Sequence, residues 1–492
     1  MARRFEFVRD ATLPLGAWSL RVHRRSDAVT VRHGAHVETF DDGFFSGVWT
    51  GDFTDGDIDT ADVRVGSGAV LRDGHVSLIT PTHPYSGVYT TLGEGCVLAS
   101  NSMLCLLAER KATPEWSNVK YFNLLSRQNR YPDADQTVAF NDTVIRSLRL
   151  DCFVIDADLD VRRVIVPGAV RFSDYKSFQT KLTEVLFRLG ENATSPKRTQ
   201  SLSLQATVSA GYDSTAAAAL AYDAGWRDAV TIVRTDDGAD DSGIAVAEHL
   251  GYRIEVCAAD AWLTRDQCPE AEFLAAGGPV TRVRLSGAPT LEQSLLLTGT
   301  MGDMTWKPGT PQIRHRHRRP FDYPGTEEGL NEWALRVGSV FLPVPSLGAD
   351  DRAQLRRVAG AQELTPWTLG NGYDRPLPRR IAEERGVPRD AFGQRKMASA
   401  QVSASTHLSY SGRADFDAWF GDRDSGAPAM HRARRASTRV ALNLARRFAS
   451  TDFADDVRNW RMVAYPTWKA AHLFHWAVER TRARYGEPFF DD

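Results

Sequence analysis

The chain carries the heptapeptide Ser-Ala-Gly-Tyr-Asp-Ser-Thr at residues 209–215, between two segments with different structural preferences. Residues 203–208 are short, alternate apolar with polar positions and end in a β-branched residue, which predicts a buried strand. The alanine-rich residues 216–223, followed by Gly225, predict a helix that ends near this glycine. The heptapeptide is therefore expected to turn the chain from the carboxyl end of a strand into the amino end of a helix.

This turn has the chemistry of an anion-binding site. The first N–H groups of a helix have no backbone partner and lie at the positive end of the helix dipole, which favours an anion. Gly211 has no Cβ to block close approach, and the hydroxyls of the turn can bond phosphate oxygens. Asp213 would repel a phosphate unless a divalent cation lies between them. The alternative is an ordinary turn capped by Ser or Asp, and the local chemistry leaves both interpretations open.

The motif differs from a Walker-type loop, because no Gly-Lys-Ser/Thr follows the turn. The sequence pattern Ser-x-Gly-x-Asp-Ser-Thr after a strand resembles the pyrophosphate loop of the N-type ATP pyrophosphatases. The surrounding chain is similar to the asparagine synthetase branch, which includes the β-lactam synthetases and lasso-peptide cyclases. Usual members have Gly where this chain has Ala210. The resemblance implies that the ATP-binding residues of this region are Ser209, Gly211, Asp213, Ser214, Thr215 and, near the adenine, Thr207 and Val233.

A second segment, residues 294–303, reads Ser-Leu-Leu-Leu-Thr-Gly-Thr-Met-Gly-Asp and begins with an apolar run that predicts a buried parallel strand. Asparagine synthetases have Ser-Gly-Glu-Gly-x-Asp-Glu at its end. Aligned on that pattern, Thr298 and Gly299 match as nucleotide-binding residues, and Asp303 matches the Asp. The resemblance implies that Asp213 and Asp303 hold Mg²⁺ between the phosphates of ATP. The alternative for Asp303 is a loop aspartate that caps a turn.

Three positions of this second segment depart from the family pattern. Thr300 replaces the first Glu, Met301 the second Gly and Met304 the final Glu. The loss of the Glu at position 300 removes the usual base at that point, which puts amine activation, and asparagine synthesis itself, in doubt.

A third segment, residues 387–396, resembles the family's stretch from Leu-Pro to Arg-x-Lys. The spacing from Pro388 to Lys396 equals that of the family, although Gln394 stands where the family has Arg. Lys396 is one of eight lysines in a chain that otherwise uses arginine. An ammonium can follow charge as it moves between oxygens, so we expect Lys396 to be catalytic. The alternative is a surface lysine after a loop.

The order of predicted elements indicates the fold class. Strands at 203–208, 229–233 and 252–257 alternate with helices, which predicts a parallel sheet with right-handed crossovers and ligands at the carboxyl ends of its strands. By resemblance, residues 170–492 form an α/β ATP-pyrophosphatase domain of the adenine nucleotide α-hydrolase type, with a helical carboxyl-terminal part. We expect residues 1–165 to form a separate, strand-rich α+β domain.

The amino-terminal domain looks like a degenerate glutaminase (Ntn-type) domain. Its short strands, separated by Gly/Asp turns, are expected at residues 16–23, 68–74, 76–79 and 95–99, followed by a capped helix at 100–109. Glutaminases of this family need an amino-terminal cysteine, whose thiolate attacks the glutamine amide. Here position 2 is Ala2 and the first cysteine is Cys96, inside a predicted strand. We therefore expect no glutamine hydrolysis and interpret the domain as a scaffold that shapes the substrate pocket.

Composition limits the partners. The 492 residues carry a formal net charge of −2, which gives no overall attraction to nucleic acid or to a membrane surface. We expect no membrane span and no signal peptide.

Five scattered cysteines form no CxxC pair, which predicts reduced thiols in the cytoplasm. Residues 314–319, Arg-His-Arg-His-Arg-Arg, are better explained as a basic loop than as a metal site, because the arginines repel cations. The sequence leaves open whether the chain is a monomer or a homodimer.

Three functions compete. The first is an ATP-dependent ligase that adenylates a small-molecule or peptide carboxylate, releases pyrophosphate and forms an amide with an amine or ammonia. The second is adenylation of a nucleobase carbonyl for thiolation or amination, which would favour a basic face or a catalytic cysteine pair. The third is a non-catalytic relative that acts by interaction, because fold alone does not imply activity. The first is the main hypothesis, with ATP and Mg²⁺ as cofactors.

Overall fold

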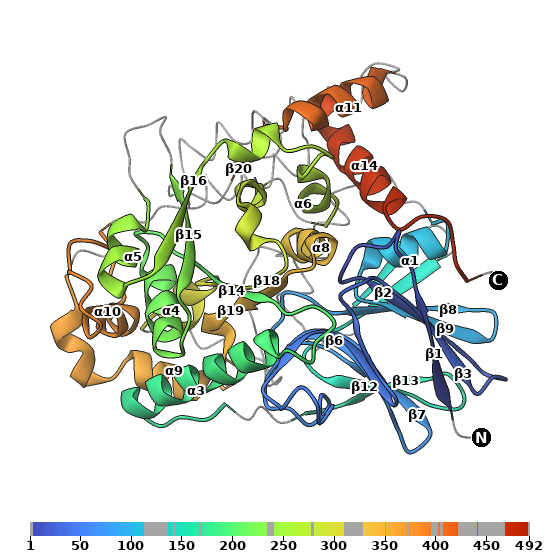
Figure 1. Ribbon diagram of the computed structural model, residues 1–492, viewed down its shortest axis with the longest axis horizontal. Coiled ribbons are helices and arrows are strands. Elements are labelled where there is room, and N and C mark those ends of the chain that lie inside the picture. Colours follow the sequence, from blue (N-terminus) through green and yellow to red (C-terminus); the bar gives the residue numbers. More distant parts are fainter. Residues whose placement is uncertain are drawn as a thin grey trace.

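The computed structural model describes residues 3–112, 136–140, 143–166, 170–233, 241–276, 280–308, 328–349, 351–370, 373–394, 402–403, 407–421, 440 and 468–490. It is a mixed α/β structure in which two stacked sheets lie beside a third, parallel sheet (Figure 1). The strands of the stacked sheets come from residues 4–164, and those of the parallel sheet from residues 203–343. Whether these two parts are independent domains stays a prediction.

The first of the stacked sheets has the strand order β1-β3-β2-β9-β8-β11-β10, and the second has the order β13-β12-β7-β6-β5-β4. In the first sheet, β1 pairs with β3 in parallel and the other neighbours pair antiparallel. Glycine-containing turns join several strands; at the β6–β7 turn both Asp73 and Gly74 have positive φ, 51° and 77°, as a tight hairpin requires. The strand bounds are β1 Arg4–Arg9, β2 Trp18–His23, β3 Ala28–His33, β4 Glu38–Phe40, β5 Gly43–Trp49, β6 Arg64–Arg72, β7 His75–Ile79, β8 Val88–Gly93, β9 Cys96–Ser100, β10 Gln136–Phe140, β11 Thr143–Leu148, β12 Cys152–Ile155 and β13 Val161–Val164.

The two sheets share a buried core. Trp18 and Leu20 of the first sheet and Phe44 and Leu78 of the second belong to one apolar cluster. Helix α1 (Met103–Glu109) packs on the other face of the first sheet, and its amino end is capped by Ser102, whose hydroxyl accepts from a backbone N–H. The strands and the capped helix expected from the sequence are therefore observed. A chain of about 160 residues can bury a core of this size.

The third sheet has the order β16-β15-β14-β18-β19, and all its neighbouring strands are parallel. Its bounds are β14 Ser203–Thr207, β15 Asp228–Val233, β16 Arg253–Ala258, β18 Ser294–Thr298 and β19 Val340–Pro343. The predicted parallel sheet is thus confirmed. Numbered by their order along the chain, the five strands lie across the sheet in the order third, second, first, fourth, fifth. The direction of winding therefore reverses between β14 and β18. This reversal is the topological switch point at which such sheets bind ligands.

Helix α4 (Tyr212–Asp223) follows β14 and is buried along most of its length. Ala216, Ala217, Ala218 and Ala219 are each 0% exposed and pack in the same core cluster as β14 and β18. Alanine side chains let the helix approach its neighbours closely, and a helix covered on all sides needs no polar face. The alanine run therefore indicates a central position.

The remaining elements surround the parallel sheet and the junction with the stacked sheets. The helices are α3 Tyr175–Thr194, α5 Ile244–Leu250, α6 Glu270–Ala276, α7 Gly302–Thr305, α8 Glu328–Val337, α9 Arg352–Ala359, α10 Pro376–Glu383, α11 Tyr410–Gly421 and α14 Trp468–Ala483. Short 3-10 helices span Ala261–Thr264, Val283–Gly287, Pro289–Leu291, Val344–Ser346 and Gln362–Trp367, and β17 (Val280–Thr281) pairs with β20 (Val402–Ser403). Within the described residues, no helix combines the length and apolar character that a membrane crossing needs.

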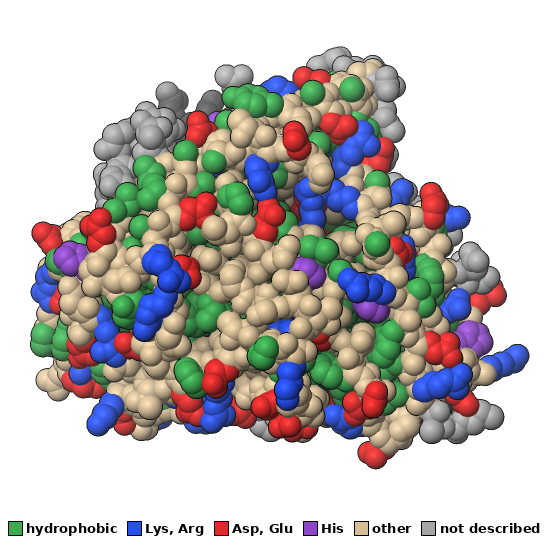
Figure 2. All heavy atoms as spheres, viewed as in Figure 1, with side chains coloured by type: hydrophobic (Ala, Val, Ile, Leu, Met, Phe, Trp, Pro, Cys, Tyr) green, Lys and Arg blue, Asp and Glu red, His purple; other side chains and the backbone are tan. Residues whose placement is uncertain are grey.

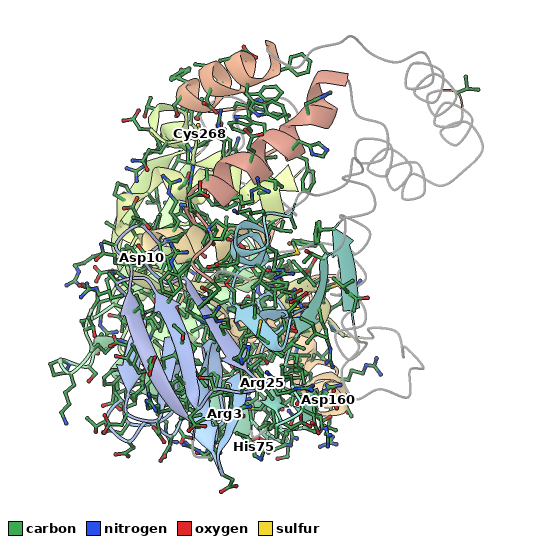
Figure 3. All side chains as sticks on the ribbon, turned by 90° about the vertical axis from the view of Figure 1, so that its right-hand side faces the viewer. Arg3, Asp10, Arg25, His75, Asp160 and Cys268 are labelled. Atoms are coloured by element: carbon green, nitrogen blue, oxygen red, sulfur yellow. The ribbon has the colours of Figure 1, made fainter. Side chains whose placement is uncertain are left out.

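The carboxyl-terminal segment joins the two parts of the molecule. Helix α14 packs on α6 and on α1 (Figures 1 and 3), and in the tail after it the rings of Phe489 and Phe490 lie against Arg32 and Arg21 of the first stacked sheet. The backbone N–H groups of Phe489 and Phe490 donate to the Glu109 carboxylate at 2.9 and 3.3 Å. On the face shown in Figure 2, basic and acidic side chains are interspersed over the surface.

One buried carboxyl lies at this junction and makes stability depend on pH. Glu332 of α8 accepts hydrogen bonds from Ser102 at 2.7 Å and from Tyr485 at 2.8 Å. Burial, with a smaller contribution from Glu328, raises the pKa of Glu332 from 4.5 to about 7. Between these values the folded chain keeps a proton that the unfolded chain has released, so this group lowers stability as pH rises through about 7.

We therefore predict that Glu332→Gln, which cannot ionise, stabilises the protein more at pH 8 than at pH 5. The gain in the free energy of unfolding should be larger at pH 8 than at pH 5 by roughly 2–4 kcal/mol. Urea denaturation of wild type and variant at both pH values measures it. Glu184→Gln, at an exposed carboxylate of α3, is the matched control and should shift both midpoints little. Parallel pH curves for wild type and Glu332→Gln would contradict the raised pKa.

Candidate functional site

The turn predicted to bind ATP begins where β14 ends and includes the first turn of α4. The hydroxyls of Ser209 and Ser214 lie 2.8 Å apart, and Ser214 Oγ accepts from the backbone N–H of Ser209. Thr215 Oγ1 donates to the Gly211 carbonyl at 2.8 Å. No side chain caps the amino end of α4 at Gly211. Ser209, Gly211, Asp213 and Ser214 are half-buried, so a ligand can reach them.

The loop after β18 packs directly on this turn. A Cβ added to Gly299 would overlap the backbone of Asp213 and Ser214, and one added to Gly302 would overlap the Asp213 carboxylate. Only glycine fits at both positions. Asp303 follows Gly302 in the short helix α7. The structure thus places the two predicted metal-binding segments in contact at the switch point of the sheet.

Tyr373 lies within electrostatic reach of both Asp213 and Asp303. Burial raises the pKa of its phenol to about 12, and the negative charges of Asp213 and Asp303 both add to this increase. The phenol is therefore neutral at physiological pH. Its ring lies 5.1 Å from that of Tyr212, which precedes Asp213. Tyr373 is a residue of the site that the sequence analysis missed, because it belongs to no recognisable motif.

The donor set fits Mg²⁺ better than a transition metal. Mg²⁺ is usually held by one or two carboxylates together with substrate phosphates, and Asp213 and Asp303 lie in adjoining segments beside the turn predicted to bind an anion. Within the ranges that the structure describes, no group of three or more His, Cys, Asp or Glu side chains is placed to hold a metal. A metal bound here would share its coordination with a ligand.

The other predicted nucleotide-binding residues lie at the same edge of the sheet. Thr207 and Val233 are the last residues of the adjacent strands β14 and β15. Thr207 Oγ1 donates to the Leu297 carbonyl of β18 at 3.2 Å. Thr298 ends β18, is 5% exposed and donates its hydroxyl proton to Thr300 at 3.0 Å. Lys396 and the basic loop at 314–319 lie outside the described residues.

A third segment, residues 389–394, docks on the same turn. The backbone N–H of Gly393 donates to the Ala210 carbonyl at 2.7 Å. Gly393 has φ +64°, and a Cβ there would overlap the ring of Tyr212. Tyr212 itself is 1% exposed and touches Phe392 edge-on, with ring centroids 5.9 Å apart. Tyr212 occupies an unspecified position of the motif, so no sequence signal identified it.

Two residues that differ from the asparagine synthetase pattern used in the sequence alignment lie in the loop after β18. Met301, aligned with a glycine of that pattern, adopts φ 80°, in the left-handed region that glycine favours. Its side chain is 3% exposed, so its burial in the core offsets part of the backbone strain. Thr300 is buried and hydrogen-bonded to Thr298, and a hydroxyl in this state is no substitute for a carboxylate base.

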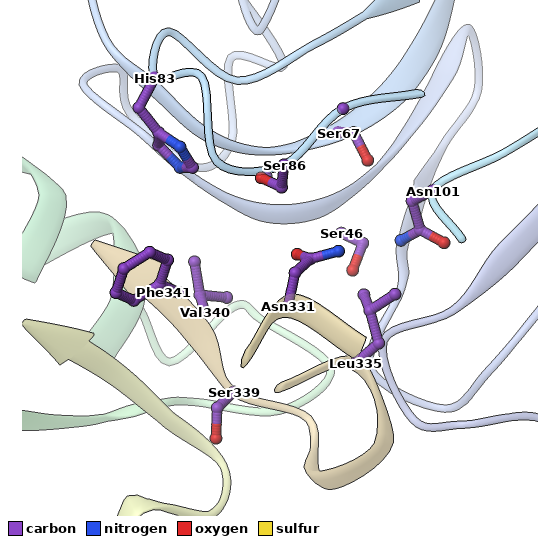
Figure 4. Close-up of a pocket in the computed structure, with 12 residues that line it drawn as sticks. Ser46, Ser67, His83, Ser86, Asn101, Asn331, Leu335, Ser339, Val340 and Phe341 are labelled. Carbon is purple, nitrogen blue, oxygen red and sulfur yellow. The ribbon is translucent and has the colours of Figure 1, made fainter. Parts of the chain in front are cut away.

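A small cavity lies between the stacked sheets and the edge strand β19 (Figure 4). Its volume is about 30 Å³, room for about two waters. Hydroxyl and amide groups line it, among them Ser46, Asn101 and Asn331, together with His83. Burial lowers the pKa of His83 to about 3, so the imidazole is neutral. Apolar side chains, Leu335, Val340 and Phe341, line the rest of the cavity, so it is uncharged, and it is too small for an organic substrate.

The cysteines bear on the glutaminase expectation. Cys96 is buried in β9, and Ala2 lies outside the described residues. All five cysteines are free thiols. Burial raises the pKa of the Cys105 and Cys152 thiols, and that of Cys268 to about 11, which makes them poor nucleophiles. The absence of glutaminase activity remains a prediction.

No protein-family model and no curated protein sequence matches the chain. A search of solved structures found a similarity to glutamine-dependent NAD+ synthetase from Acinetobacter baumannii, solved in complex with adenosine diphosphate. The sequence identity is 12%, the match covers 75% of this chain and 83% of that chain, and the TM-score is 0.18. A TM-score of this size supports no conclusion about fold or function.

We predict that Gly302→Ala disturbs the site without unfolding the protein, because the added methyl group meets the Asp213 carboxylate. Such overpacking typically costs about 1–3 kcal/mol, and here the cheapest relief is a displaced carboxylate. MgATP affinity, measured by calorimetry, should fall while the circular dichroism spectrum is retained. The matched control is Gly421→Ala at the end of α11, where a Cβ meets nothing within 4 Å. Equal MgATP binding by both variants would contradict the assignment.

Proposed function

We propose that the protein is an ATP-dependent ligase that adenylates a substrate carboxylate and forms an amide with an amine or ammonia. The convergence of the 209–215 turn with the Gly299–Asp303 loop carries this proposal. The turn presents helix N–H groups and hydroxyls for phosphate, and the loop adds a second carboxylate beside Asp213. Both lie at the carboxyl ends of the two central parallel strands, where nucleotides bind in sheets of this order.

In the first step, an oxygen of the substrate carboxylate attacks the α-phosphorus of ATP. A bond forms between this oxygen and phosphorus, and the bond from the α-phosphorus to the pyrophosphate oxygen breaks. Ser209, Ser214 and the first N–H groups of α4 would hold the departing pyrophosphate, a role supported by the proximity of the two hydroxyls and by the absence of a side-chain cap at Gly211. Asp213 and Asp303 would hold Mg²⁺, which neutralises charge on the phosphates when bound. Thr207 and Val233 would contact the adenine with their main chain.

In the second step, the amine nitrogen attacks the acyl carbon and AMP leaves with the electron pair of the broken C–O bond. The nitrogen must lose a proton, and none of Thr300, Met304 and Tyr373 accepts one readily. A threonine and a methionine have no basic group, and the phenol of Tyr373 has a pKa of about 12 and is already protonated. We infer that the amine reacts as its free base or finds its base outside these residues.

The nitrogen donor is proposed to be an amine or free ammonia. Four of the five cysteines are buried, which makes them poor candidates for the nucleophile of a glutaminase. The stacked sheets then serve as a scaffold beside the synthetase part. A non-catalytic interaction protein and an enzyme that adenylates a nucleobase carbonyl remain the competing functions, and an activity test separates them.

We predict that the wild-type protein catalyses ATP–pyrophosphate exchange with at least one carboxylic acid in a screen of amino acids, peptides and small organic acids. Exchange requires only the first step, so the amine need not be known. Asp213→Asn and Asp303→Asn should each abolish exchange while the fold is retained. Asp223→Asn, at the other end of α4, is the matched control and should keep activity. Wild-type activity in Asp213→Asn would remove the metal assignment.

Lys396 lies outside the described residues, and its proposed role rests on its spacing from Pro388 and on the scarcity of lysine in the chain. We predict that its ammonium stabilises the charge that develops on the α-phosphate in the first step and on the tetrahedral centre in the second. Lys396→Arg and Lys396→Met should each lose about 3 kcal/mol of transition-state stabilisation, or roughly two to three decades in turnover, with ATP affinity little changed. The exposed Lys197, changed in the same two ways, is the control. An active Lys396→Arg variant would show that the position supplies only bulk positive charge.

A further inference from the structure

Arg379 is a fully buried cation in α10, with 0% exposure. A buried guanidinium costs several kcal/mol of desolvation unless its donors are paired. Its charge partner is Glu383, one turn further along the helix, at 3.0 Å. The guanidinium contacts two aromatic rings, 4.9 Å from the centroid of Tyr212 and 4.8 Å from that of Phe392. Arg379 therefore has one neighbour in the phosphate turn and one in the docked segment.

The donors of Arg379 hold the docked segment in a tight curve. Nη1 donates to the Arg389 carbonyl at 3.0 Å, and Nη2 points to the carbonyls of Phe392 and Gly393, each at 3.4 Å. Glu383 also pairs with the guanidinium of Arg389, at 2.8 Å. The chain from residue 389 to residue 393 is thus wrapped around one guanidinium.

The same guanidinium also holds the phosphate turn. Nη2 donates to the hydroxyl of Tyr212 at 2.8 Å, and Gly393, fixed by the curve, donates its N–H to the Ala210 carbonyl at 2.7 Å. Ala210 and Tyr212 flank Gly211 on both sides. Arg379 therefore anchors the residues on both sides of Gly211. It bonds Tyr212 directly and reaches Ala210 through Gly393. Gly211 is the glycine that the phosphate is expected to approach.

We infer that Arg379 is a positioning residue for the pyrophosphate part of ATP, an inference that rests on the proposed function. It touches no substrate itself. It holds Tyr212 and the Ala210 carbonyl, and so sets the direction of the N–H groups and hydroxyls in the turn between them. Because the adenine is expected at Thr207 and Val233, on the strand side of the turn, this effect should be selective for the β- and γ-phosphates.

The test compares three probes on the full-length protein by calorimetry: MgATP, magnesium pyrophosphate and AMP. Arg379→Lys keeps the charge but cannot reach all acceptors of the planar group. It should weaken MgATP and magnesium pyrophosphate by about 10-fold and leave the AMP affinity unchanged. Tyr212→Phe keeps the ring and loses only the hydroxyl, so it should weaken the same two probes by about 3- to 10-fold. This second variant keeps the test decisive if Arg379→Lys folds poorly.

Arg380→Lys is the matched control. Arg380 is the next residue of α10, pairs with Glu363 and Glu384 at 2.8 Å and stacks over Tyr175, away from the phosphate turn. It should leave all three affinities unchanged. Equal weakening of all three probes, or weakening by Arg380→Lys as well, would reduce Arg379 to a general structural role and overturn the inference. Unchanged affinities in both Arg379→Lys and Tyr212→Phe would overturn it too. If the wild type binds neither MgATP nor pyrophosphate, the proposed function fails, and the inference fails with it.

Discussion

Neighbouring parallel strands lie about 4.8 Å apart, so loops that leave the same ends of β14 and β18 begin side by side. One of these loops enters α4 and the other enters α7, and both must fit into the space above the switch point. They fit because Gly299 and Gly302 bring backbone against Asp213 and Ser214, where any Cβ would overlap. This contact brings Gly302, and with it the adjacent Asp303, against the Asp213 carboxylate. The proposed binding of phosphate and metal depends on it.

The surroundings of α4 make this contact rigid. The four consecutive alanines of the helix are fully buried, so the helix cannot shift without disturbing the core of the sheet. At its amino end Tyr212 is held by Arg379, and Ala210 receives the N–H of Gly393. The turn is therefore supported by the sheet below it and by the 389–393 segment beside it. Preorganisation of this kind spares a binding site the cost of ordering its loop when the ligand arrives.

The sequence predicted those strands and helices whose residues form a local pattern. The strand at 203–208, the alanine helix and the apolar run at 294–298 follow from periodicity and turn residues within a few positions of each other, and their alternation predicted a parallel sheet. The order of the strands across that sheet was not predicted. The contact between Tyr212 and Arg379 joins residues 167 positions apart, and neither lies in a motif position that specifies a side chain. The sequence analysis did not identify Tyr373 either, because it also lies in no motif. Lys396 was proposed from spacing alone and stays a prediction.

The substitutions at Thr300, Met301 and Met304 affect the two half-reactions differently. Adenylation needs a phosphate turn, a pair of carboxylates and a place for the acid, and these substitutions leave the turn and the carboxylates intact. In the proposed reaction, amide formation also needs a proton acceptor. Among the described residues, Thr300 is a buried, hydrogen-bonded hydroxyl and the phenol of Tyr373 has a pKa of about 12, so neither accepts a proton readily. An amine of low pKa is already a free base when it attacks, whereas a strongly basic alkylamine must first lose a proton. In either case the nitrogen releases one further proton as the amide forms, which the departing AMP or water can take. The proposed second step would therefore proceed most easily with a weakly basic nitrogen nucleophile.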